Sequence, residues 1–139
     1  MTEERPMDAE EFVRRVRQTI ADEELDDMYR QLATVDRTTI PASAPQRWRQ
    51  ALALYDSLTA EQQETLFYLL REERIYTLAS LFGMLDGVHQ LAGRFEHFEL
   101  AYVGRRIDES RFTREKVILS GDLQDYLFGQ EQDAQDGQS

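Results

Sequence analysis

The sequence predicts a mainly α-helical fold, a small helical bundle around a central long helix over about residues 60–86. Apolar residues recur every three to four positions through most of the chain, and two capping-box patterns mark helix starts. Near the C-terminus, two short apolar runs instead suit strands and predict a β-hairpin over about 95–103 and 116–120. We expect one helical domain over residues 1–128 and a disordered acidic tail over 129–139.

The first predicted helix begins after Asp8, which can cap it, with Glu11 three residues later. Two apolar stripes follow, one over 12–20 and one over 25–32, and in a straight helix they would point in opposite directions. The acidic run 22–24 between them resembles a new helix start. We therefore expect a break or kink near residues 21–23. The alternative is one long helix between two partners.

Residues 33–44 are expected to be a connector, because they are rich in turn residues and lack a helical period. Pro45 suits the start of the next helix. From Trp48 to Leu58 the apolar residues fall on one face, which predicts a short amphipathic helix.

Thr59 and Gln62 form the second capping-box pattern and open the most apolar region of the chain. The stripe Leu66, Leu69 and Leu70 is rotated by about 120° from the stripe over 75–85. The charged run 71–74 lies between the two stripes, so the helix either breaks there or is buried on two sides. We favour one continuous helix, because no Gly or Pro interrupts it before Gly83, with Gly87 as its C-terminal stop.

After Gly87 the pattern is ambiguous, because residues 88–102 fit a helical period while Phe98, Leu100 and Tyr102 alternate as in a strand. We prefer strands over about 95–103 and 116–120, joined by a long arginine-rich loop over 104–115. A short last helix is expected from Leu123 to Phe128.

Composition and charge exclude several classes of function. The chain lacks cysteine, which excludes disulfides, thiolate metal sites and cysteine nucleophiles. Its net charge of −11 is concentrated at the two ends, so nucleic-acid phosphates and anionic membranes would be repelled. No apolar run approaches the length of a membrane span, and the N-terminal residues do not resemble a secretory signal. We therefore expect a cytoplasmic protein.

His89, His97 and Asp86 are the weak candidates for a metal site, because histidine and carboxylate side chains can ligate zinc or iron. Their spacing matches no established metal-binding pattern, so we favour ordinary surface and loop roles and expect no cofactor. Serine-nucleophile, phosphate-loop and dinucleotide motifs are also lacking in the sequence.

Glu73 falls on the face of Leu66 and Leu70 in a continuous helix, where a carboxylate must be paired, hydrated or functional. One interpretation is an acid–base residue in a pocket. We favour a structural one, in which Glu73 is at least half buried in an ion pair with Arg74 or another arginine.

The partner-binding candidates lie mostly in the only basic segment of the chain. Arginine-rich loops can bind acidic or phosphorylated partners, although this segment could equally balance the protein's own acidic residues. Trp48 is of a type enriched in binding hot spots, but its helical face favours burial in the core. The candidates are Arg105, Arg106, Arg111, Phe112, Arg114 and Trp48.

The leading hypothesis is a non-enzymatic protein–protein interaction module, an accessory, regulatory or antitoxin/immunity-like protein of bacterial type with a basic protein partner. A second hypothesis is a metal- or small-ligand-binding helical enzyme that uses Glu73, His89 and His97. A third is a self-assembling structural protein, in which a second subunit covers part of helix 61–85.

Overall fold

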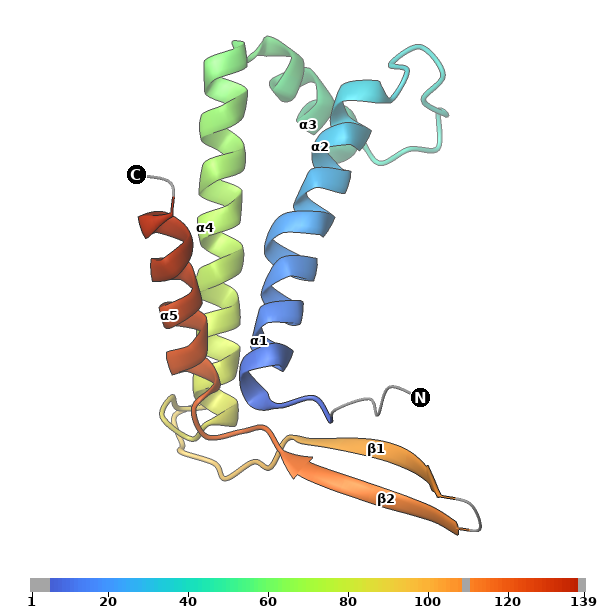
Figure 1. The fold of residues 1–139 in the computed structure, drawn as a ribbon. Coiled ribbons are helices and arrows are strands. Elements are labelled where there is room, and N and C mark those ends of the chain that lie inside the picture. The colour runs from blue at the N-terminus through green and yellow to red at the C-terminus, as the bar shows by residue number, and fades with distance from the viewer. Residues whose placement is uncertain (1–5, 109–110, 138–139) are drawn as a thin grey trace. The chain divides into compact units, whose positions relative to one another are not determined.

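The structure of the protein is a computed structural model that describes residues 6–108 and 111–137, without the side chains of residues 105–115. The fold is mainly helical, with one antiparallel hairpin before the final helix, as the sequence predicts (Figure 1). The elements in chain order are α1 (Ala9–Arg17), the π-helix η1 (Gln18–Glu23), α2 (Glu24–Thr34), α3 (Gln46–Ser57), α4 (Ala60–Leu85), β1 (Ala101–Asp108), β2 (Arg111–Ile118) and α5 (Leu123–Asp136).

The chain forms two compact units. We call residues Thr19–Arg74 the middle unit, and Met1–Gln18 together with Ile75–Ser139 the terminal unit. The middle unit contains most of η1, α2, α3 and the first part of α4. The terminal unit contains α1, the last part of α4, the hairpin and α5.

Helix α1 begins where the sequence predicts, because an Asp8 carboxylate oxygen accepts the backbone N–H of Glu11 at 2.8 Å. The break or kink predicted near residues 21–23 falls within the π-helix η1, where the chain leaves α-helical geometry but stays helical. A π-helix bonds each N–H five residues back, so its turn holds more residues than an α-turn. Val13 of the first stripe is buried in the terminal unit, and Leu25 and Leu32 of the second stripe are buried in the middle unit, so the two stripes do not have to share one core.

Helix α4 is continuous through the charged run 71–74, as predicted. Its start is a reciprocal capping box in which Thr59 N donates to Gln62 Oε1 at 2.9 Å and Gln62 N donates to Thr59 Oγ1 at 3.2 Å. Beyond its end, Gly87 has a φ of 77°, which a glycine adopts without strain.

The core of the middle unit is a cluster of Leu32, Leu52 and Tyr55, contributed by α2 and α3. Partly buried apolar residues pack around it, namely Val35, Ile40, Trp48, Leu66 and Phe67. The Phe67 ring meets Tyr29 edge-on at a centroid distance of 5.0 Å and Tyr55 at 6.3 Å. This cluster fixes the connector and α3 against α2 and the first part of α4.

The core of the terminal unit joins α1, α4 and α5 through side chains with little or no exposed surface. They include Val13, Phe82, Leu123 and Leu127. Phe12 packs on Phe82 with ring centroids 6.2 Å apart. Helix α4 therefore buries apolar residues of its 75–85 stripe in this unit, whereas it contributes Leu66 and Phe67 to the middle unit.

The structure contains the predicted hairpin, but its strands cover different residues from the predicted ones. The arginine-rich residues 104–108 and 111–115 are not a loop, because their backbones pair in register from Ala101↔Ile118 to Asp108↔Arg111. Residues 95–100 are not a strand. The antiparallel ladder satisfies the backbone N–H and C=O groups that a loop would leave to water.

Helix α5 does not stop at Phe128, and residues 129–136 are helical rather than a disordered tail. Its last turns are held against α1, because Gln130 Nε2 donates to Glu10 O at 2.9 Å and Arg17 Nη1 lies 3.1 Å from Glu131 Oε1. These contacts join residues more than a hundred positions apart. Local composition could not indicate them.

Candidate functional site

The two arginines of α4 both point toward η1 and the start of α2. Arg71 Nε donates to Asp22 Oδ1 at 2.9 Å, and Arg74 Nη1 donates to the backbone oxygen of Ile20 at 2.6 Å. Arg74 Nη1 also lies 3.7 Å from Glu24 Oε2. The positive charge of α4 is therefore used inside the middle unit, on carboxylates and on a carbonyl of the π-helix.

The outward side of α4 in the middle unit has the opposite character. Tyr68 and Leu69 are 62% and 58% exposed, so an adjacent aromatic and aliphatic pair faces solvent on this helix. Around them stand the carboxylates Glu61, Glu64 and Glu72, all exposed. Within the described part of the chain, none of these three carboxylates forms an ion pair. We call these five residues the acidic α4 face.

The acidic α4 face combines negative charge with apolar contact area. The ring of Tyr68 can accept a cation over its face, and carboxylates one or two helical turns away can pair with the same or a neighbouring cation. A surface of this kind favours a positively charged, partly apolar partner over an anion or a purely apolar surface.

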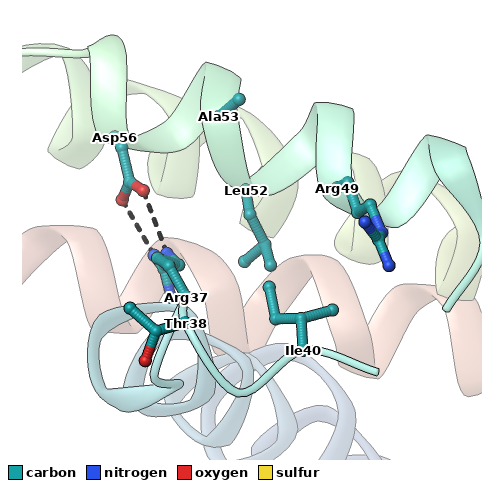
Figure 2. A pocket seen from close by; sticks show the side chains of 7 residues that line it. All are labelled: Arg37, Thr38, Ile40, Arg49, Leu52, Ala53 and Asp56. Carbon is teal, nitrogen blue, oxygen red and sulfur yellow. Dashed lines mark hydrogen bonds and ion pairs between the residues drawn. The ribbon is translucent and has the colours of Figure 1, made fainter. Parts of the chain in front are cut away.

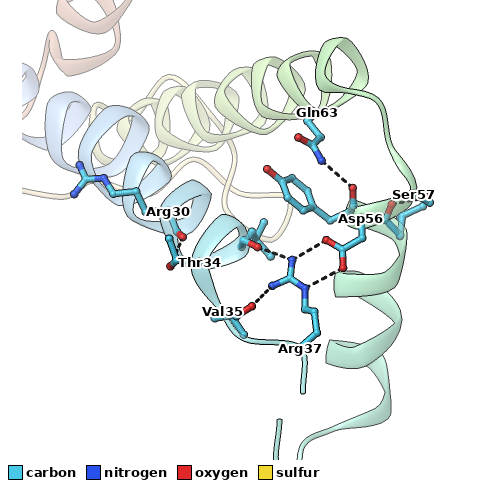
Figure 3. Close-up of polar contacts among 10 residues, drawn as sticks. Arg30, Thr34, Val35, Arg37, Asp56, Ser57 and Gln63 are labelled. Carbon is cyan, nitrogen blue, oxygen red and sulfur yellow. Dashed lines mark hydrogen bonds and ion pairs between the residues drawn. The ribbon is translucent and has the colours of Figure 1, made fainter. Parts of the chain in front are cut away.

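A second group of polar contacts, around Arg37, has a structural role (Figure 3). Arg37 binds Asp56 with two parallel hydrogen bonds of 2.9 and 2.8 Å, from Nε and Nη2. It also donates to the carbonyl oxygens of Leu32 at 2.6 Å and Val35 at 2.7 Å. One guanidinium thus caps the C-terminal end of α2 and ties it to α3.

Hydrogen bonds and burial shift the pKa values of three acidic groups in the middle unit. The hydrogen bonds from Arg37 lower the pKa of Asp56, and the bonds from the Thr38 side chain and backbone lower the pKa of Asp36. Burial raises the pKa of Tyr55, and the neighbouring Tyr29 adds to that rise.

The predicted burial of the Glu73–Arg74 pair does not hold for the carboxylate, because Glu73 is exposed. Leu70, Arg71 and Arg74 occupy the partly buried side of that helical turn. Arg74 is the more buried partner, with its side chain 23% exposed, and it reaches Ile20 and Glu24.

Of the three metal-site candidates, Asp86 has a clear structural role. Its carboxylate accepts the backbone N–H groups of Gly121 at 2.7 Å, Leu123 at 3.2 Å and Gln124 at 2.9 Å. Asp86 therefore caps the start of α5, although it lies 36 positions before Asp122, the residue at the N-cap position of that helix. The Asp122 side chain itself makes no capping hydrogen bond.

His89 and His97 are both exposed. Among the described residues, no group of three or more potential ligands could hold a metal ion. The second hypothesis also used Glu73, which lies in the middle unit, whereas both histidines lie in the terminal unit.

The partner-binding candidates fall into two groups. Trp48 is partly buried and packs against the core cluster of Leu32, Leu52 and Tyr55, in agreement with the interpretation from its helical face. The other five candidates belong to the hairpin, and their side chains lie outside the described residues. For Arg105, Arg106, Arg111, Phe112 and Arg114, partner binding stays a prediction.

The buried ion pair of the terminal unit was missed by the sequence reasoning. Arg17 and Glu131 have side chains only 17% and 11% exposed. Arg17 Nε is buried and has no hydrogen-bond partner among the described residues, so the charge of the guanidinium depends on its contact with Glu131. No sequence pattern signals it, because Glu131 lies two residues after Gly129 in an acidic stretch whose composition resembles a disordered tail.

None of the described helices is both long enough and apolar enough to cross a lipid bilayer. Comparisons of the chain with protein-family models, with curated proteins and with solved structures gave no match.

Proposed function

We propose that the protein is a non-enzymatic interaction module, an accessory or regulatory protein that binds a basic segment of another protein. The acidic α4 face is the observation that carries this proposal. It presents Tyr68 and Leu69 to solvent among three carboxylates that lack an ion-pair partner in the described chain, while the arginines of the same helix point elsewhere.

Charge complementarity decides the kind of partner. A second copy of the same face would bring carboxylates against carboxylates, which costs affinity, so self-association through this face is disfavoured. A helix or extended segment with lysines or arginines beside apolar residues would satisfy both components of the surface. The acidic net charge of the chain would also steer such a segment toward it, and more strongly at low salt.

The test uses a fluorescently labelled, lysine-rich amphipathic helical peptide and measures its affinity by anisotropy. Glu64→Lys combined with Glu72→Lys should weaken binding by about tenfold or more. The matched control combines Asp26→Lys with Asp133→Lys, two exposed acids outside the face, and changes the net charge by the same amount. The control should have a clearly smaller effect.

Apolar contact is tested separately. Leu69→Ala should weaken binding of the peptide, whereas Leu54→Ala, an equally exposed leucine on α3, should not. If both charge-reversed proteins lose affinity equally and neither leucine matters, the acidic α4 face is not a binding site and the proposal fails.

A further inference from the structure

A pocket of about 420 Å³ lies between α3 and the connector that precedes it (Figure 2). This volume falls within the range of about 300–1,000 Å³ that is usual for small-molecule sites. The pocket is lined by Arg37, Thr38, Ile40, Arg49, Leu52, Ala53 and Asp56, all in the middle unit.

One side of the pocket is apolar and held in place by the core. Leu52 is 2% exposed and belongs to the core cluster, and Ile40 packs against that cluster. Figure 2 shows the Leu52 and Ile40 side chains facing each other between the two arginines. Ala53 adds a small side chain on α3, which leaves room beside it.

The two arginines at the pocket differ in how their charges are balanced. The charge of Arg37 is compensated by Asp56 in a bidentate pair, and its guanidinium also donates to the carbonyl oxygens of Leu32 and Val35. Among the described residues, the Arg49 guanidinium makes one hydrogen bond, from Nη2 to the carbonyl oxygen of Pro41 at 2.7 Å. Within the described residues no carboxylate pairs with Arg49, so the pocket carries a net positive charge beside an apolar wall.

We propose that this pocket binds a small organic anion, with its carboxylate on Arg49 and a short apolar body against Ile40, Leu52 and Ala53. A guanidinium that already has one neutral acceptor keeps further N–H donors for a carboxylate. A cationic ligand would meet the net positive charge, and a neutral one would leave Arg49 unpaired. The site is independent of the proposed function, because the pocket and the acidic α4 face have no residue in common.

Trp48 can report ligand binding through its fluorescence. It is the single tryptophan of the chain, it precedes Arg49, and it is partly buried. Its fluorescence is titrated with octanoate, with 1-octanol and with octyltrimethylammonium, which differ only in the head group. Octanoate should give a saturable change. Octanol should bind about tenfold more weakly or worse, and the cation should not saturate the signal.

Variants on α3 supply the matched comparison. Arg49→Gln should weaken octanoate binding by about tenfold or more, whereas Arg47→Gln should change it by less than about twofold, because Arg47 is exposed and does not line the pocket. Ala53→Phe should abolish binding by filling the pocket, with an unchanged helical circular-dichroism spectrum. Equal affinities for octanoate and octanol, equal effects of the two arginine variants, or the lack of any saturable change would each overturn the proposal.

Discussion

The two units use the same chemistry, an arginine paired with a carboxylate, in opposite settings. In the middle unit, Arg37 and Asp56 are 19 positions apart, and their side chains are 29% and 49% exposed. In the terminal unit, Arg17 and Glu131 are 114 positions apart, and their side chains are 17% and 11% exposed. Water can replace a lost partner in the first pair but only poorly in the second. The same substitution should therefore have very different consequences in the two units.

The buried pair offers the largest contrast. Glu131→Ala leaves Arg17 largely buried without its carboxylate, and we expect it to lower the free energy of unfolding by about 2–4 kcal/mol. Urea denaturation followed by circular dichroism measures the loss. Replacing both partners with apolar residues, Arg17→Met with Glu131→Leu, should cost less than Glu131→Ala alone. If the double variant is the less stable of the two, burial of an unpaired charge is not the cause.

The remote cap of α5 should have the next largest effect. Asp86→Ala removes a carboxylate that accepts three backbone N–H groups, and a lost cap typically costs about 1–2 kcal/mol. Asp122→Ala, at the position next to the helix, should cost less than about 0.5 kcal/mol, because its side chain makes no capping bond. The reverse order of the two thermal midpoints would show that α5 is capped locally.

The exposed pair should give the smallest effect, and one that depends on pH. Arg37 lowers the pKa of Asp56, so the ionised carboxylate stabilises the fold above its ordinary value of 3.8. This contribution disappears as the pH falls from there through the lower pKa of the folded state.

The stability difference between the wild type and Asp56→Asn should therefore shrink on acidification below about pH 4. Thermal denaturation at a series of pH values measures the difference. In an Arg37→Gln background, the pH-dependent part of the Asp56→Asn effect should be absent. If it persists unchanged there, Arg37 is not its source.

The elements that could be predicted are those whose signals lie within a turn or two of the chain. Asp8 and Thr59 mark helix starts because a cap and its target N–H groups are three residues apart. The prediction for α4 succeeded because no glycine or proline interrupts the helix before Gly83, two residues from its end. The hairpin was predicted, but its strands were expected over 95–103 and 116–120 instead of 101–108 and 111–118. Strand pairing depends on which backbone segments meet, and the local sequence does not specify this.

The candidate site was only partly accessible to this reasoning. Acidic character, and with it the expectation of a basic partner, followed from composition. The outward direction of Tyr68 and Leu69 did not, because the periodicity alone placed Leu69 with Leu66 and Leu70, which are partly buried. Glu73 was assigned to the buried side for the same reason. Which face of a helix is exposed to solvent depends on the neighbouring elements that cover its other faces.

By itself, the sequence determined the helical class, the starts of α1 and α4, the unbroken length of α4 and the acidic surface, because each depends on neighbouring residues or on composition. The tertiary structure alone decided the π-helix at 18–23, the extension of α5 past Gly129, the capping role of Asp86 and the burial of Arg17 with Glu131. Each of these depends on packing against, or contact with, groups distant in the chain, and short-range periodicity carries no information about such contacts.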